Sequence, residues 1–286
     1  MKNKGIIFYL FIAFGLAWIS WEIPLQTGLS PRSLLFQLWA LPGAFAPAVA
    51  ALIVRKWVTR EGFADAGFRL NLRKWPYYLF AWFWPLAVIF FIILLAVGFR
   101  VGLPNFSFLH SILALAPGKG IPPVWASNLW FILPAQLLAS ALISTPLLWG
   151  EEFGWRSYLQ IRLFSQNPLL AAVTTGLIWG IWHLPLNLRG VNFPGHPILG
   201  LFLFPVGTIL LSIIFGWIRL QTGSIWPVSL AHASTNAVGA SLSELLFAGN
   251  SDMLWVSYLG ILGWIPLGGM CAWIIVTGRL KMEAEK

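Results

Sequence analysis

Long apolar stretches follow one another along almost the whole chain, and this succession constrains the fold more than any other feature. A helix that crosses a membrane needs about 20 mostly apolar residues. The stretches of that kind are residues 5–22, 34–54, 76–98, 128–150, 168–187, 197–218, 225–247 and 254–277. Only 9% of the residues are charged, against roughly a quarter in soluble domains. We therefore predict an all-α, polytopic transmembrane helix bundle of about eight spans.

The connections between these stretches leave no room for a separate soluble domain. The longest are residues 55–75 and 99–127, and both are rich in Gly, Pro or charge. We expect one membrane domain over residues 1–286, with the catalytic helices inside 128–240.

The first stretch has the length of a span and no clear cleavage site follows it, so it is expected to be a membrane helix rather than a signal peptide.

The basic residues predict the orientation in the membrane. The formal net charge is +9, but the Lys and Arg residues lie in short connections, so no nucleic-acid partner is expected. The most basic connection carries Arg55, Lys56, Arg60, Arg69, Arg73 and Lys74. Basic connections are usually cytoplasmic. This predicts that both termini are cytoplasmic. Fewer basic residues are expected outside, namely Arg100, Lys119 and Arg189. We expect a multi-pass protein of a prokaryotic cell membrane.

Two adjacent acids, Glu151 and Glu152, directly follow an apolar helix, where charge is costly unless it is paired or functional. Arg156 lies four residues after Glu152, so the two share a helical face and can form an ion pair. Glu151 is rotated away by about 100 degrees and stays available for chemistry. The ordinary alternative is that both acids mark a solvated helix end.

Two later segments carry histidine inside apolar helices. Trp179 and His183 are one turn apart in the span 168–187, and His232 and Asn236 share a face of the span 225–247. A lone intramembrane histidine can simply satisfy a carbonyl, and a His–Asn pair can be interhelical hydrogen-bond glue. Histidine is also the usual acid or base near neutral pH. His232 and His183 lie about 12 and 24 Å from the cytoplasmic starts of their helices, so a centre in the inner half of the bilayer could unite them with Glu151. Other ionisable residues lie near outer helix ends or in connections, and we assign them no catalytic role. They are Glu22, His110, His196, Glu244 and Asp252.

Together these segments resemble the signature of the CAAX protease and bacteriocin-processing family of intramembrane endopeptidases, which runs EExxxR, [FW]xxxH, HxxxN. The matched motifs are Glu151–Glu152 with Arg156, Trp179 with His183, and His232 with Asn236, and no motif position departs from the pattern. The resemblance implies that Glu151 and His183 activate a water and that His232 and Asn236 bind the oxyanion. Glu152, Arg156 and Trp179 would support the site.

The resemblance leaves the metal open, because the family is described both as metalloproteases and as glutamate-dependent enzymes. We favour a Glu-activated water and no firm cofactor. One zinc ion held by Glu151, His183 and His232 is the alternative, although the HExxH helix typical of zinc proteases is lacking.

We expect hydrolysis of a peptide bond in a membrane-associated substrate, either a prenylated CAAX-like C-terminus or a leader or bacteriocin-type peptide, in a cavity open to the cytoplasmic side. Two other functions stay open: a proton-coupled transporter, whose relay would use the same residues, and a non-catalytic immunity or scaffold protein.

Overall fold

The structure is a computed structural model and describes residues 2–31, 33–107, 128–247, 249 and 251–281, so that His110 and Lys119 lie outside the described residues. Every regular element in these ranges is helical, as predicted. The α-helices are α1 (Lys2–Gln26), α2 (Leu34–Ala44), α3 (Ala46–Ile53), α4 (Trp75–Gly98), α7 (Leu129–Gly154), α8 (Pro168–Trp182), α9 (Leu184–Asn187), α10 (Pro197–Thr222), α11 (Trp226–Ser234), α12 (Ser241–Phe247), α13 (Met253–Val256) and α14 (Ile261–Val276). The π-helical segments are η1 (Val54–Val58), η4 (Trp155–Leu159) and η5 (Thr235–Ala240), and the 3-10 turns are η2 (Ala64–Ala66) and η3 (Leu72–Lys74).

In the described ranges, six helical segments are long and apolar enough to cross a membrane. They are Lys4–Gln26, Leu34–Val58, Leu72–Gly98, Phe131–Leu159, Pro197–Thr222 and Met253–Val276. The other two predicted spans are helical but are not among the six. Helix α8 has 15 residues and is about 22 Å long, shorter than the roughly 30 Å of a hydrocarbon core.

Helix α8 also ends earlier than its apolar stretch. The predicted span 168–187 breaks at His183, which caps α8 before the short helix α9 begins. Pro185 explains the break, because proline lacks the N–H that would continue the hydrogen-bond ladder and disfavours helical backbone in the residue before it. His183 therefore lies at a helix end rather than inside a helix.

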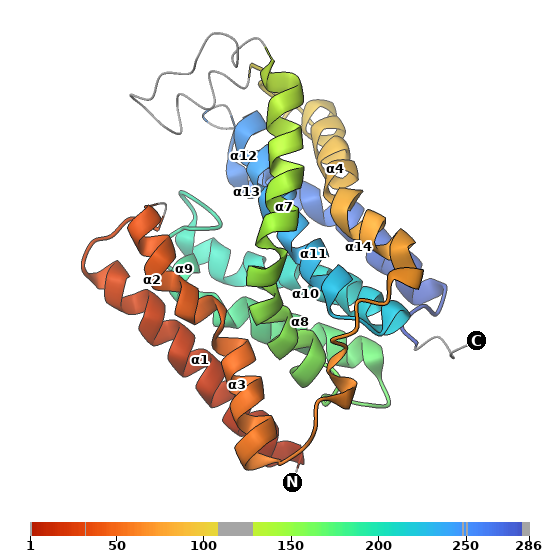
Figure 1. The fold of residues 1–286 in the computed structure, drawn as a ribbon. Coiled ribbons are helices and arrows are strands. Elements are labelled where there is room, and N and C mark those ends of the chain that lie inside the picture. The colour runs from red at the N-terminus through yellow and green to blue at the C-terminus, as the bar shows by residue number, and fades with distance from the viewer. Residues whose placement is uncertain (1, 32, 108–127, 248, 250, 282–286) are drawn as a thin grey trace.

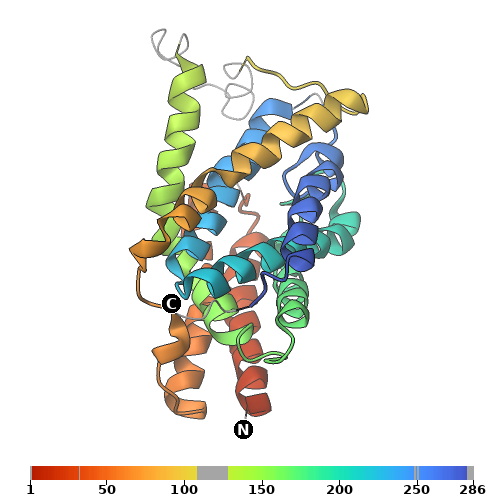
Figure 2. The same cartoon turned by 90° about the vertical axis from the view of Figure 1, so that its right-hand side faces the viewer.

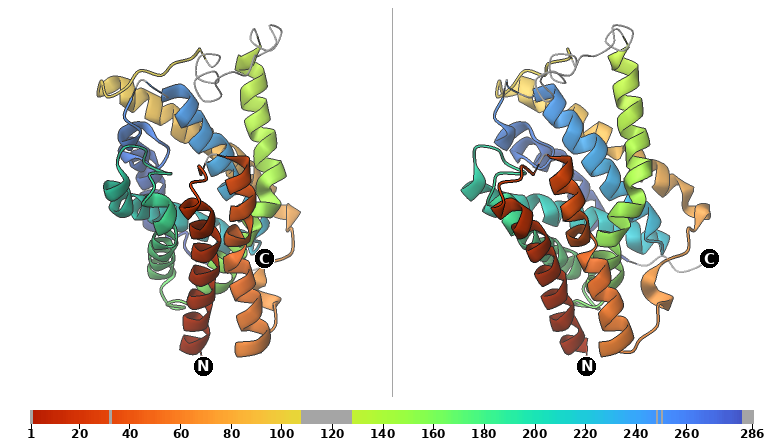
Figure 3. Two further views of the ribbon diagram at one scale, coloured as in Figure 1. Left: turned by 90° about the vertical axis from the view of Figure 1, so that its left-hand side faces the viewer. Right: turned by 60° about the vertical axis from the view of Figure 1, so that its left-hand side comes forward.

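The helices form three groups around the middle of the molecule (Figure 1). Helices α7 and α11 pack against each other, and α8 packs against α10. Helices α2 and α3 pack against one side of α7, and α1 packs against α2 and α3, as Figure 3 shows for α1 and α3. Helices α4 and α14 cover the other side, against α11 and α10 (Figure 2). The site-bearing helices α7 and α11 therefore pack against each other and are flanked by α3 on the side of α7 and by α4 on the side of α11.

Small residues allow α8 and α10 to approach closely. A Cβ added to Gly176 would lie 2.5 Å from the Cα of Ile209, which a real side chain cannot do. The hydroxyl of Thr208 donates to the carbonyl of Gly176 at 2.9 Å, and that of Ser212 to the carbonyl of Ala172 at 2.7 Å. Close backbone contact with hydroxyl cross-links is the usual way for membrane helices to associate.

The outer surface of the bundle is apolar. Phe11, Phe131 and Val276 are 77%, 80% and 84% exposed. An apolar surface of this extent is costly in water and favourable in lipid. Together with the membrane-length helices, it identifies the chain as an integral membrane protein.

Candidate active site

The predicted site residues come from three neighbouring parts of the bundle. Glu151 and Glu152 lie in the last turn of α7, just before the π-helical turn η4 that contains Arg156. His183 caps α8, and His232 lies in α11. Asn236 follows in η5, so π-helical backbone adjoins two of the three motifs, as it often does at functional sites.

Glu152 is the centre of a buried polar cluster. Its Oε1 accepts a hydrogen bond of 3.0 Å from Nη1 of Arg156, which is the ion pair expected from the sequence. The same oxygen lies 2.8 Å from Nδ1 of His232. Both Glu152 and Arg156 are fully buried, and the guanidinium lies 4.6 Å above the ring of Trp179. Since a carboxylate only accepts, Nδ1 of His232 carries the hydrogen, and the imidazole is fixed with Nε2 left for another partner.

Glu151 has a hydrogen-bond partner of its own. Its Oε2 accepts a hydrogen bond of 2.9 Å from the indole N–H of Trp179. The side chain is 7% exposed, so it is nearly shielded from solvent. One oxygen of Glu151 is thus oriented by a neutral donor, and the arginine neutralises the other acid, Glu152.

Trp179 also orients His183. Nδ1 of His183 lies 3.0 Å from the backbone carbonyl of Trp179. A carbonyl only accepts, so Nδ1 donates and Nε2 stays free to accept a proton. The imidazole packs edge-on against Trp182 and Phe204, with ring centroids 4.8 and 4.9 Å away. One tryptophan therefore sets the position of both Glu151 and His183.

A cavity of about 310 Å³ brings the four predicted catalytic residues together, since Glu151, His183, His232 and Asn236 all line it. Asn236 is exposed, whereas His232 is 3% exposed. The cavity is large enough for several waters or part of a peptide, and its polar groups converge from three helices, as in many enzyme sites.

The cavity wall includes residues that sequence reasoning missed. Ser257 and Tyr258 line it from the break between α13 and α14, and Phe204 and Thr208 line it from α10. Ser257 and Tyr258 fall inside the apolar stretch 254–277, and Phe204 and Thr208 inside 197–218, which gave no sign of a functional role. Only the tertiary contacts place them at the site.

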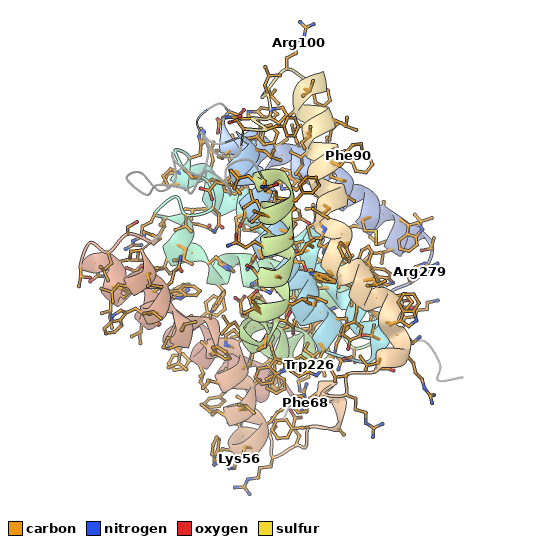
Figure 4. The ribbon with its side chains drawn as sticks, turned by 45° about the horizontal axis from the view of Figure 1, so that its top comes forward. Lys56, Phe68, Phe90, Arg100, Trp226 and Arg279 are labelled. Atoms are coloured by element: carbon orange, nitrogen blue, oxygen red, sulfur yellow. The ribbon has the colours of Figure 1, made fainter. Side chains whose placement is uncertain are left out.

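The surface opening of the cavity lies away from the basic connection. Helix α11 begins beside that connection, where the indole N–H of Trp226 donates to the carbonyl of Phe68 at 2.8 Å. At the other end of the same helical run, Asn105 N–H donates to Leu246. Figure 4 shows Lys56, Phe68 and Trp226 toward one end of the molecule and Arg100 at the other.

Along this axis the cavity reaches the surface at Val191, Asn236 and Ala240, which are exposed. Glu152 and Val228, on its basic side, are fully buried. If the basic connection is cytoplasmic, as expected from the sequence, these exposed wall residues lie toward the opposite side of the membrane.

The alternative zinc site does not fit this arrangement. In the described part of the chain, no three His, Cys, Asp or Glu side chains lie together so as to hold a metal ion. Glu151, His183 and His232 share a cavity, but each is oriented by a separate protein partner. We derive no step through a metal.

The acids and histidines outside the site have structural partners where the structure describes them. Arg189 forms two hydrogen bonds of 2.9 and 2.7 Å with the carboxylate of Glu22, which ties the end of α9 to α1. His196 and Asp252 lie 2.8 Å apart at the surface. These contacts hold helices and connections together, which is a structural role.

Comparison with models of known protein families gives a match over part of the chain. Residues 125–238 match the family model described as type II CAAX prenyl endopeptidase Rce1-like. The matched region contains all seven residues of the three motifs. No curated protein matches the chain.

Proposed function

The chain belongs to the CAAX protease family through its Rce1-like segment, residues 125–238, and on this premise we propose that it hydrolyses a peptide bond of a membrane-associated substrate with Glu151 as the base. A peptidase of this family acts on a peptide or protein substrate in the membrane.

In the proposed reaction, Glu151 takes a proton from a water whose oxygen attacks the carbonyl carbon of the scissile bond. Nε2 of His183 accepts the second hydrogen of that water and holds it in line. A C–O bond forms and the carbonyl electrons move to oxygen. When the C–N bond breaks, the proton held by Glu151 passes to the departing amine, which leaves a new carboxyl and a new amino terminus.

The negative oxygen of the tetrahedral intermediate needs donors. Protonated at both nitrogens, His232 donates from Nε2 while Nδ1 donates to Glu152, whose charge stabilises the imidazolium. The side-chain amide of Asn236 supplies the second hydrogen bond. Fixed donors of this kind stabilise a developing oxyanion strongly because they need no reorganisation during the reaction. Arg156 in turn holds Glu152 in place.

One observation carries the proposal: Glu151, His183, His232 and Asn236, from three parts of the chain, line the same cavity. The test compares peptide termini in membranes of cells that express the chain or its Glu151→Gln variant. Loss of the base is expected to slow cleavage roughly 100- to 10,000-fold, so that substrates accumulate uncut. His183→Ala should do the same while both variants keep the melting temperature of the parent. Retained cleavage in both would refute the proposal.

The two substrate classes are separated with purified protein in detergent. One assay offers a farnesylated CAAX-ended protein and the other a membrane-bound leader peptide, each with Glu151→Gln as control. The alternative functions are tested with the same variant. Proton flux into liposomes that is lost in Glu151→Gln would favour a transporter, and binding without turnover would favour a scaffold.

A further inference from the structure

A second cavity, of about 470 Å³, lies behind the candidate active site. Its polar lining includes Arg156, Gln160, Arg219 and Lys281, and its apolar lining includes Phe164 and Leu220. It is separate from the catalytic cavity, with which it shares no lining residue. Arg156 lies between the two, because its Nη1 bonds to Glu152, which in turn holds His232.

Three of the polar side chains around this cavity are buried and incompletely bonded. Arg156 is fully buried, and its Nε and Nη2 have no hydrogen-bond partner among the described residues. Gln160 and Arg219 are 7% and 9% exposed, and Oε1 of Gln160 and Nε of Arg219 likewise lack partners in the described ranges. Buried donors on charged groups are costly unless an acceptor meets them.

The carboxylates nearby are already engaged. Asp65 pairs with Arg55 at 2.7 Å and with Arg162 at 3.2 Å, and it offers Arg219 only its backbone carbonyl. Glu152 is shared between Arg156 and His232. The positive charges of Arg156, Arg219 and Lys281 therefore have room for one further anion.

The location of the cavity limits what that anion is. Arg219 lies in the last turn of α10 and donates a hydrogen bond to the carbonyl of Asp65 in the basic connection. The cavity therefore lies at the basic face of the bundle. Its other walls are apolar and include Ile161, Leu163 and Leu280. Basic pockets between membrane helices on that face are suited to anionic lipid head groups, because the phosphate meets the cations and the acyl chains meet apolar wall.

We propose that this second cavity binds the phosphate group of an anionic phospholipid through Arg156, Arg219 and Lys281. Bound phosphate satisfies the free donors of Arg156 and fixes the guanidinium that holds Glu152 and, through it, His232. The lipid therefore acts as a structural ligand of the bundle, and its effect on cleavage rests on the proposed function.

The binding test uses the full-length chain in detergent micelles and native mass spectrometry. Dioleoyl phosphatidylglycerol and dioleoyl phosphatidylcholine are offered at equal concentration. We expect one phosphatidylglycerol to be retained per chain, and Arg219→Gln and Lys281→Gln each to weaken it about tenfold, the size of one charge-assisted hydrogen bond. Lys281 is exposed, so its loss is not expected to disturb folding. Arg279→Gln removes an equal charge from the same face outside the cavity lining and should bind like the parent.

Four outcomes would overturn the proposal. Equal retention of phosphatidylcholine, which carries a phosphate but no net charge, would show that the site does not select an anionic lipid. Equal weakening by Arg279→Gln would show that binding depends on the overall charge of this face and not on the cavity. Displacement of the lipid by millimolar inorganic phosphate would assign the cavity to free phosphate. Binding seen only when the chain is shortened to end at Lys281 would make its own acids, Glu283 and Glu285, the occupant. All of these readouts are independent of cleavage, so a failed Glu151→Gln test leaves this result unaffected.

Discussion

The indole N–H of Trp179 donates a hydrogen bond of 2.9 Å to Oε2 of Glu151. It orients the proposed base without neutralising it, because an indole carries no charge. Trp179→Phe keeps an aromatic ring but removes the donor and one of the two fused rings of a buried side chain. We expect the cleavage rate of the folded protein to fall roughly 10- to 100-fold, the value of a hydrogen bond to a charged group, and the melting temperature to fall as well because the smaller ring leaves a cavity. An unchanged rate would show that Glu151 needs no such orientation.

The buried cluster around Glu152 predicts a large stability effect. Glu152→Gln removes the charge that Arg156 and His232 share, and leaves a buried guanidinium without its carboxylate. We expect the free energy of unfolding to drop by about 3–5 kcal/mol. The control is Arg189→Gln, which breaks the partly exposed pair with Glu22 and should cost about 1 kcal/mol or less. Chemical denaturation in micelles, followed by tryptophan fluorescence, measures both. Similar losses would contradict the prediction.

The close approach of α8 and α10 predicts that Gly176 does not tolerate a side chain. Gly176→Ala places a methyl group against the backbone of α10 and should destabilise the bundle by about 1–3 kcal/mol. Gly268→Ala is the matched control in α14, where an added Cβ meets nothing within 4 Å. Both variants gain helix propensity, so the difference between their melting temperatures isolates the clash. Equal melting temperatures would refute the contact.

Asp65 predicts a stability change in acid. Burial alone would raise the pKa of its carboxyl, but the hydrogen bond and charge of Arg55, with the charge of Arg162, lower that pKa below its usual value. The resulting stabilisation is present above about pH 4, the ordinary aspartate value, and is lost as the pH falls through the lowered value. The difference in melting temperature between the parent and Asp65→Asn should therefore be constant from pH 7 to 5 and shrink toward pH 3. A difference that grows in acid would show that folding raises the pKa of Asp65 instead of lowering it.

The position of the cavity opening predicts which side of the membrane the substrate reaches. With the basic connection in the cytoplasm, Val191 at the cavity mouth faces the outside. The chain has one cysteine, Cys271, which is buried, so single cysteines can be introduced with a low background. In intact cells, Val191→Cys should react with an impermeant maleimide, and Arg60→Cys should react only after permeabilisation. The reverse pattern would place the cavity on the cytoplasmic side.

The class of fold and the local relations within each motif follow from the amino-acid sequence alone. Helical membrane spans are a consequence of local composition, because lipid forces the backbone to satisfy its hydrogen bonds within the segment. The Glu152–Arg156 pair was equally predictable, since residues four apart in a helix are neighbours whatever surrounds them.

Tertiary structure alone decided which helices meet. The contacts of His232 with Glu152 and of Trp179 with Glu151 span 80 and 28 residues. Ser257 and Tyr258 enter the cavity wall only because the chain breaks before α14 packs. The side on which the cavity opens also depends on these arrangements. Apolar helices can pack against one another in many ways, and the choice depends on side-chain shape and on hydrogen bonds between helices, neither of which a hydropathy pattern contains.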